Sequence, residues 1–300
     1  MHNTQDKKRI GVLQVIIGTV LISFSSVFVK LANTGPTVIG FYRMLFGGII
    51  LLFVLKILRG RLWQGKIHFL LALSCSVIFS LDLFLWHRSI THIGPGLATL
   101  LSSFQVFFLA GFSIFVLKQK ILPRLIISIF LAVTGLYLIV GIDWHTLQLS
   151  NKIGILFGLI TAVCYAAYVL ILRRIASQES LLSVGNWATL TLITLVNTLI
   201  MGTVAFLSEE SFNIPDTQSW LALLGYGLGS QVLAWVFISA GLSKVSILEV
   251  GLILILQPAL AFVWDIIFFN RHTPPIEVVG IILCIGGIYL GTARGGIARR

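Results

Sequence analysis

Six polar or aromatic side chains lie inside long apolar stretches of the sequence, where they could bind a small molecule away from water. Glutamine amides donate and accept hydrogen bonds, and indole rings pack against apolar groups, so together they suit a small polar or amphipathic ligand. The candidate substrate-binding residues are Gln105, Gln257, Gln231, Trp235, Trp86 and Trp264. The alternative is structural, because amides also join neighbouring helices and tryptophan is common at membrane interfaces.

Two opposite charges, Arg43 and Asp82, fall inside consecutive apolar stretches. Helical rise places them about 10 Å and about 12 Å below the same membrane surface. An unpaired charge at that depth is costly, so we expect an ion pair. The pair is either a structural clamp or a gate, in which a proton-responsive Asp82 releases Arg43 for an anionic substrate.

Catalysis has no specific signal in this sequence. Asp82 and Asp265 lack the sequence context of intramembrane aspartyl proteases, the segment 227–231 is not a nucleophile elbow, and no HExxH occurs. We therefore predict that the protein is not an enzyme and uses no cofactor or metal. Three scattered cysteines give neither a disulfide framework nor a metal site; they are Cys75, Cys164 and Cys284.

The composition excludes an ordinary soluble domain. Of 300 residues, 57% are hydrophobic and 10% are charged, against roughly 25% charged in soluble proteins. The net charge of +11 comes from basic residues in short connections and forms no long basic face, so we expect no nucleic-acid partner. The composition predicts an all-α, multi-pass membrane protein with the lipid bilayer as its surroundings.

Ten apolar blocks divide into two sets of five. Each is about long enough to cross a bilayer as a helix. They cover residues 10–32, 36–58, 67–89, 94–117, 123–141, 152–173, 183–207, 218–240, 246–269 and 275–293. The predicted organisation is an N-terminal segment 1–9, a first repeat 10–141, a linker 142–151, a second repeat 152–293 and a basic tail 294–300.

A shift of 152 residues relates the two sets. It brings Gln105 onto Gln257 and Gly135 onto Gly287, so that GLYL in the first half matches GIYL in the second. Because five is an odd number, the second set must enter the membrane in the opposite orientation, which makes the halves inverted repeats. Gln105 and Gln257 then both lie about 16 Å deep, near the midplane, where such repeats enclose a substrate site.

Lys and Arg predict the orientation. If the N-terminus is cytoplasmic, the inner segments hold 16 of them and the outer segments hold 3. Cytoplasmic loops carry the excess of basic residues, so we expect both termini in the cytoplasm and the protein in the cytoplasmic (inner) membrane.

The sequence resembles the EamA-type family of the drug/metabolite transporter superfamily in three features. They are ten predicted helices in two inverted halves, the segment Phe41, Tyr42 and Arg43, and a Gly-containing final helix in each half. The resemblance implies export or exchange of small metabolites, amino acids among them, by alternating access. Many members have a mid-helix proline in both halves and a Gly-Glu pair at the end of each fourth helix. Here Pro258 is matched by Val106 in the first half, and the glutamate positions hold Gln119 and Arg271.

Three functions remain open at this point. The first is a transporter of a small metabolite with a midplane cavity between the repeats. The second is a flippase or carrier of a lipid-linked or anionic, sugar-phosphate-like substrate. The third is a non-transporting assembly or sensor subunit. A small-molecule substrate is the expected partner, and a homodimer is compatible with the sequence.

Overall fold

The computed structural model describes residues 2–118, 123–140, 149–176, 183–270 and 274–292, and all regular structure in these ranges is helical. Seven of the described helices are long and apolar enough to cross a membrane, and three shorter apolar helices accompany them. Several residues named in the sequence analysis lie outside the described part of the chain. They are Gln119, Arg271, the predicted tail 294–300, the predicted linker up to residue 148 and the side chain of Asp265.

The chain folds into two compact units, and each unit takes segments from both halves of the sequence. Unit 1 consists of residues 1–84 and 167–244, and unit 2 consists of residues 85–166 and 245–300. Contacts within a unit therefore join elements that are far apart along the chain.

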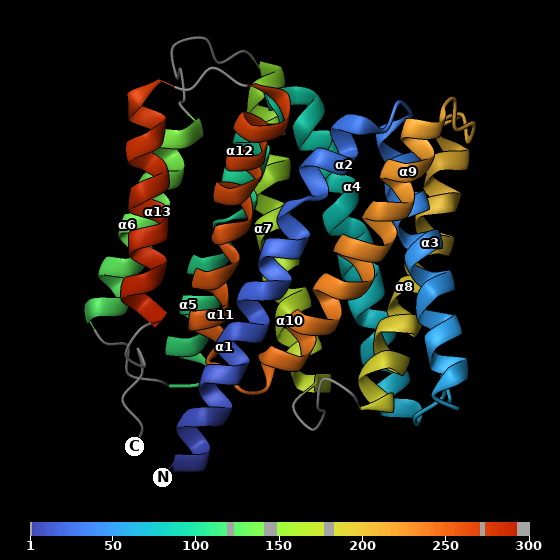
Figure 1. Ribbon diagram of the computed structural model, residues 1–300, viewed down its shortest axis with the longest axis horizontal. Helices are drawn as coiled ribbons and strands as arrows, with labels where there is room; N and C mark the ends of the chain where they lie inside the picture. The colour runs from blue at the N-terminus through green and yellow to red at the C-terminus, as the bar shows by residue number, and fades with distance from the viewer. Residues whose placement is uncertain (1, 119–122, 141–148, 177–182, 271–273, 293–300) are drawn as a thin grey trace. The chain divides into compact units, whose positions relative to one another are not determined.

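Unit 1 is built from paired helices. Its elements are α1 (His2–Ser23), α2 (Ser25–Leu31), α3 (Pro36–Ile57), the start of α4 (Lys66–Ser102), the end of α7 (Leu149–Ala176), α8 (Val184–Leu207), α9 (Thr217–Gly225), the π-helix η2 (Tyr226–Leu233) and α10 (Ala234–Leu242). α1 packs along α10 and α3 packs along α8 (Figure 1). A Cβ atom added at Gly18 would lie 2.7 Å from the carbonyl oxygen of Ala234, so the missing side chain lets α1 approach the α10 backbone closely.

A carboxylate caps the first turn of α3. Pro36 begins the helix, and the Glu210 carboxylate accepts hydrogen bonds from the backbone N–H groups of Thr37 (3.0 Å) and Val38 (3.2 Å). The Thr37 hydroxyl also donates to it, at 2.5 Å. The N–H groups of a first helical turn have no partner inside the helix, and a negative charge there is favoured by the helix dipole. Glu210 thus ties the connection after α8 to the start of α3.

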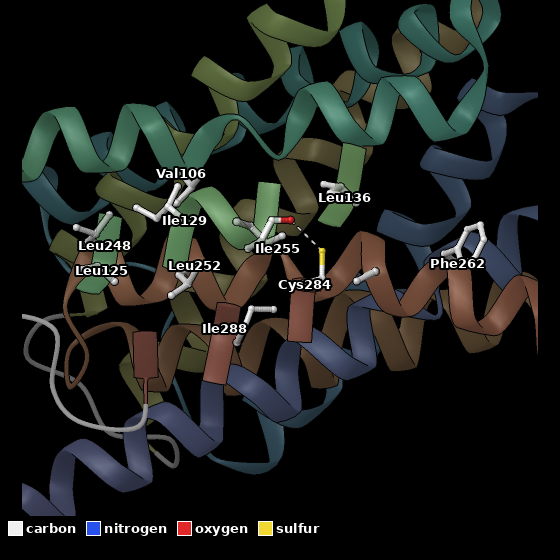
Figure 2. Packing of buried hydrophobic residues seen from close by; sticks show 12 residues of the cluster. Val106, Leu125, Ile129, Leu136, Leu248, Leu252, Ile255, Phe262, Cys284 and Ile288 are labelled. Atoms are coloured by element: carbon white, nitrogen blue, oxygen red, sulfur yellow. Dashed lines mark hydrogen bonds between the residues drawn. The ribbon is translucent and has the colours of Figure 1, made fainter. Parts of the chain in front are cut away.

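Unit 2 contains a second set of helices. They are the end of α4, α5 (Gln105–Phe115), α6 (Pro123–Val140), the start of α7, α11 (Ile247–Leu254), α12 (Leu256–Phe269) and α13 (Pro275–Thr292). Buried apolar side chains from α5, α6, α11, α12 and α13 form one core (Figure 2). α6 and α13 run side by side along most of their length (Figure 1).

The contacts between α6 and α13 are reciprocal under the shift of 152 residues. A Cβ atom at Gly287 would meet the carbonyl oxygen of Ser128 and the backbone nitrogen of Ala132. A Cβ atom at Gly135 would meet the equivalent atoms of Gly280 and Cys284. The Cys284 thiol donates to the Ala132 carbonyl oxygen at 2.9 Å (Figure 2). The two glycines thus occupy equivalent places in an antiparallel helix pair.

The helix boundaries differ from the predicted blocks in two ways. The break expected between residues 89 and 94 is absent, because α4 stays helical from Lys66 to Ser102. Three predicted helices are interrupted: 10–32 at residue 24, 94–117 at residues 103–104 and 246–269 at residue 255. At each place the backbone forms an i→i−3 hydrogen bond, as from the Ile255 N–H to the Leu252 carbonyl oxygen.

Candidate functional site

Arg43 is the centre of a buried polar cluster in unit 1. Its side chain is 4% exposed. Nε donates to Oε1 of Gln231 at 3.0 Å, and Nη1 donates to the hydroxyl of Tyr226 at 3.0 Å. The guanidinium carbon also lies 4.8 Å from the centre of the Tyr226 ring and 5.9 Å from that of Phe79. Hydrogen bonds and cation–π contacts together hold the guanidinium in one orientation.

The π-helix explains how Tyr226 and Gln231 both reach Arg43. In an α-helix, residues five apart point about 140° away from each other, because each residue turns the helix by about 100°. The wider turn of η2 brings the two side chains toward the same side. α3 and η2 also approach closely at glycines: a Cβ atom at Gly227 would lie 2.9 Å from the backbone nitrogen of Gly47. The glycine-rich sequence therefore produces both close packing and an irregular turn.

Further hydrogen bonds connect this cluster to α8. The Gln231 amide nitrogen donates to the Thr194 hydroxyl at 3.0 Å. One turn further along α8, the Asn197 amide oxygen accepts a hydrogen bond from the Ser80 hydroxyl of α4 at 2.5 Å. Gln231 is therefore fixed at both ends of its amide, which in turn fixes the position of its bond to Arg43.

Aromatic rings pack beside the polar groups. Phe79 stacks on Tyr168, with ring centres 4.6 Å apart, and Trp235 meets both rings edge-on at 5.7 Å and 4.9 Å. Trp235 has no exposed surface. Because these rings hold Phe79 against the guanidinium, the aromatic group limits the access of water to Arg43.

Asp82 supplies a buried carboxyl group to this region. Its side chain is 6% exposed, and it interacts electrostatically with Arg43 without forming a salt bridge to any residue that the structure describes. Oδ1 of Asp82 and Nη2 of Arg43 are both buried and have no hydrogen-bond partner among the described residues. We call Arg43, Asp82, Thr194, Tyr226 and Gln231 the Arg43 cluster. It can bind a polar ligand, and it contains no nucleophile activated by a base.

Four of the residues chosen from the sequence thus lie in unit 1. Arg43 and Gln231 are in direct contact, and Trp235 reaches the guanidinium through Phe79. The expected ion pair does not form as a salt bridge among the described residues, although Asp82 interacts electrostatically with Arg43. Whether Arg43 and Asp82 serve as a gate stays a prediction.

The other four candidates lie in unit 2. Gln105 follows the interruption at residues 103–104, and Gln257 follows the one at residue 255. Gln105 is buried, and its amide oxygen has no hydrogen-bond partner in the described part of the chain. Trp86 packs against His87, with ring centres 5.2 Å apart, and Trp264 against Phe268, at 6.2 Å. Their place in a substrate cavity stays a prediction.

Sequence reasoning missed Tyr226, Thr194 and Phe79. Tyr226 lies between glycines and five residues before Gln231, a spacing that an ordinary helix would place on another face. Thr194 and Phe79 have residue types that are common in any membrane helix, so only the packed structure identifies them.

Comparison with known proteins agrees with the fold. The model of the EamA-like transporter family matches residues 9–141 and 152–292. A crystal structure of a protein is similar over 95% of this chain and 97% of its own, with a TM-score of 0.82 and 15% sequence identity, and that likeness concerns the fold alone. No curated protein matches the sequence. The two matched segments cover most of the chain, and this multi-pass membrane protein therefore belongs to the EamA-like transporter family.

Proposed function

We propose that this protein exports or exchanges a small metabolite, such as an amino acid, across the cytoplasmic membrane, with both termini in the cytoplasm. The observation that carries the proposal is the unpartnered Nη2 of Arg43, buried in an apolar helix. Charged residues inside membrane helices are costly and mark substrate or ion pathways. In this proposal the Arg43 cluster is the polar site that a substrate occupies during transport.

A purely structural role for Arg43 fits less well. A buried arginine that only joins helices is stabilised when its donors are satisfied, because each unsatisfied buried group costs free energy. Here Nε and Nη1 are bonded to Gln231 and Tyr226, whereas Nη2 has no partner in the described residues. A ligand atom that accepts a hydrogen bond from Nη2 would satisfy the remaining nitrogen of the guanidinium.

We further propose that transport proceeds by alternating access, with the two sequence halves acting as inverted repeats. The reciprocal contacts of Gly135 and Gly287 support the repeat relation, since equivalent residues of the halves meet equivalent partners. The helix interruptions before Gln105 and near Gln257 support a binding role for these glutamines, because broken helices are common at transporter sites. Trp86 and Trp264 belong to the same proposed cavity.

Exchange in proteoliposomes tests this function. Purified protein is reconstituted with one unlabelled solute inside, and entry of the same labelled solute is followed for each common amino acid and a set of other small metabolites. We expect at least one solute to exchange faster than in empty liposomes. Arg43→Gln should slow that exchange by about ten- to hundredfold, the effect of losing a charged hydrogen bond.

Lys56→Gln is the matched control, because Lys56 lies exposed at the end of the same helix and its loss removes the same charge. It should leave exchange unchanged. Exchange by Arg43→Gln at the wild-type rate, or no exchange of any solute by the wild type, would refute the proposal.

A further inference from the structure

We propose that unit 1 contains a hinge, formed by two irregular backbone segments that lie side by side, and that Gln231 is the latch of this hinge. The first segment is the interruption between α1 and α2 at Phe24, and the second is the π-helix η2. The pair of helices α1 and α10 swings about these two segments relative to the rest of unit 1. The inference goes beyond the proposed function, because it concerns motion inside unit 1 whether or not a solute binds to Arg43.

The interruption between α1 and α2 is built around serines. The Phe24 N–H forms a long bond of 3.4 Å to the Leu21 carbonyl oxygen, an i→i−3 contact where an α-helix has i→i−4 bonds. The hydroxyls of Ser23, Ser25 and Ser26 each donate to the carbonyl oxygen three residues earlier, at 2.6, 2.5 and 3.2 Å. Serine hydroxyls that bond to the preceding turn bend helices, so the chain can change direction here.

The π-helix η2 supplies the second irregular segment at the same level. The Ser230 hydroxyl donates to the Leu21 carbonyl oxygen at 3.4 Å, so the middle of η2 faces the interruption between α1 and α2. At the end of η2 the Ala234 N–H bonds to the Gly229 carbonyl oxygen, five residues earlier, and α10 then continues as an ordinary α-helix. Helices bend sharply at π-helical turns and at glycine and serine positions. Both neighbouring segments can therefore bend at one level.

On one side of the hinge, α1 and α10 form a tightly packed pair. A Cβ atom at Gly18 would lie 2.7 Å from the Ala234 carbonyl oxygen, and one at Gly241 would lie 2.8 Å from the Gly11 carbonyl oxygen. Backbone thus meets backbone at two places, about 10 Å apart along the helices by helical rise. Because close-packed helices transmit displacement to one another, α1 and α10 move together.

On the other side of the hinge, polar contacts fasten α9 to the end of α2. The Asn33 N–H donates to the Ser219 hydroxyl at 2.9 Å, and the Asn33 side chain donates to the Asp216 carboxylate at 3.0 Å. The Gln218 amide donates to the Leu31 carbonyl oxygen at 3.1 Å. These bonds join the two helices from both partners, so α2 and α9 also form one body.

Gln231 connects the hinge to α3 and α8. It lies in η2, donates to Thr194 of α8 and accepts a hydrogen bond from Arg43 of α3. A Cβ atom at Gly47 would lie 2.9 Å from the Cβ atom of Gln231, so this residue also packs directly on α3. Breaking the two bonds would leave buried polar groups without partners, which costs free energy. The bonds therefore hold the hinge in one orientation and couple it to Arg43.

Distances between two nitroxide spin labels, measured by pulsed EPR on the full chain in lipid nanodiscs without any solute, test the hinge. The labels are attached to a ketone-bearing amino acid, so the native cysteines stay unchanged. One pair of labels spans the hinge, from Leu13 of α1 to Phe53 of α3, and the reference pair joins Leu221 of α9 to Phe53. All three side chains are more than half exposed.

The lever from the hinge to Leu13 sets the expected shift. Leu13 lies about 16 Å from Phe24 along the helix, so a bend of about 20° would displace its label by about 5 Å. In the wild type we expect the Leu13–Phe53 pair to show a second population at this displacement. The Leu221–Phe53 pair should show one narrow population.

Three variants test the role of Gln231. Thr194→Val removes the hydroxyl that accepts from Gln231 and should raise the second population about two- to tenfold, the effect of one neutral hydrogen bond. Gln231→Leu loses both bonds and should raise it further. Thr198→Val is the matched control, because the Thr198 hydroxyl bonds only within α8, to the Thr194 carbonyl oxygen. It should leave the wild-type distances unchanged.

The wild-type comparison decides the inference even if a variant fails to fold. A single, equally narrow population for both pairs of labels would overturn the hinge. Equal effects of Thr194→Val and Thr198→Val would overturn the latch. Because no solute is present, the result is separate from the exchange assay: exchange that depends on Arg43 in a protein without the second population would leave the proposed function standing and remove the hinge. A second population in a protein that exchanges no solute would do the reverse.

Discussion

Replacing Gly287 with alanine should separate α6 from α13 and destabilise unit 2. The added Cβ atom would lie 2.8 Å from the carbonyl oxygen of Ser128 and 2.9 Å from the backbone nitrogen of Ala132. Both neighbours are backbone atoms of a regular helix, so neither can rotate away as a side chain could. The helices must move apart, and their other contacts along the interface must loosen.

Gly286→Ala is the reference from which the destabilisation by Gly287→Ala is measured. A Cβ atom there meets nothing within 4 Å, so Gly286→Ala adds the same methyl group in the same helix without a clash. Alanine favours a helix over glycine by up to about 1 kcal/mol, and this gain is common to both variants. The difference between them should therefore measure the clash, at about 1 to 3 kcal/mol, the usual cost of overpacking.

The equivalence of Gly135 and Gly287 predicts similar effects of the two substitutions. Gly135→Ala should destabilise by about the same amount as Gly287→Ala, because its Cβ atom would meet the equivalent backbone atoms of Gly280 and Cys284. The double variant should lose less than the sum of the two, since a helix pair that one methyl group has already separated has room for the second.

The free energy of unfolding of these variants can be measured by titrating the protein with SDS in mixed micelles and following its helical circular dichroism. A Gly287→Ala variant as stable as Gly286→Ala would refute the proposed close approach. A Gly135→Ala variant without effect would refute the equivalence of the two glycines.

Three other perturbations test unit 1 by the same titration. Glu210→Gln should lower the free energy of unfolding of unit 1 by about 1 to 2 kcal/mol, because the negative charge at the start of α3 and one hydrogen-bond acceptor are lost. Glu209→Gln, at the exposed neighbouring position, should change this free energy little. Equal effects of the two variants would argue against the capping role of Glu210. Hydrogen bonds, first from the Asn33 side chain and then from the Ser219 backbone, lower the pKa of Asp216 below its ordinary 3.8. The stability that ionised Asp216 contributes should be complete above pH 3.8 and be lost as the pH falls through the lowered pKa. Asp216→Asn should remove this loss of stability in acid, and an unchanged acid profile in that variant would contradict the prediction. Burial lowers the pKa of Lys244 from 10.5, so the free energy of unfolding should rise with pH between the lowered pKa and 10.5. Lys244→Met should abolish this rise. A rise that persists in the variant would show that another group causes it.

Much of the helical pattern could be predicted from the sequence. Block edges such as 36–58 and 275–293 fall within a residue of α3 and α13, because apolar length decides where a membrane helix can lie. The shift of 152 residues also placed Gly135 and Gly287 in equivalent positions, which the reciprocal contacts of α6 and α13 match.

The irregular backbone could not be predicted in the same way. Hydrophobicity does not distinguish a continuous α4 from two helices with a short apolar connection, nor an intact helix from one that switches to i→i−3 bonds at residue 255. Such choices depend on packing with partners far along the chain. The same holds for the two compact units, which mix segments of both halves.

The site could be predicted only in part. Arg43, Asp82 and Gln231 stand out because polar groups are rare in apolar helices. Their depths predict an ion pair between Arg43 and Asp82, whereas the described residues show an electrostatic interaction without a salt bridge. Their partners depend on the π-helix, whose wider turn brings Tyr226 to Arg43. A residue-by-residue helical projection assumes a constant turn, so it misses such a contact.

An experimental structure with a transported solute bound is the most direct test of the Arg43 site. A hydrogen-bond acceptor of the solute should lie within hydrogen-bond distance of Nη2 of Arg43, while the bonds from Nε to Gln231 and from Nη1 to Tyr226 remain in place. A solute bound elsewhere, with Nη2 of Arg43 bonded only to the protein, would contradict the assignment of Arg43 as the substrate-binding group.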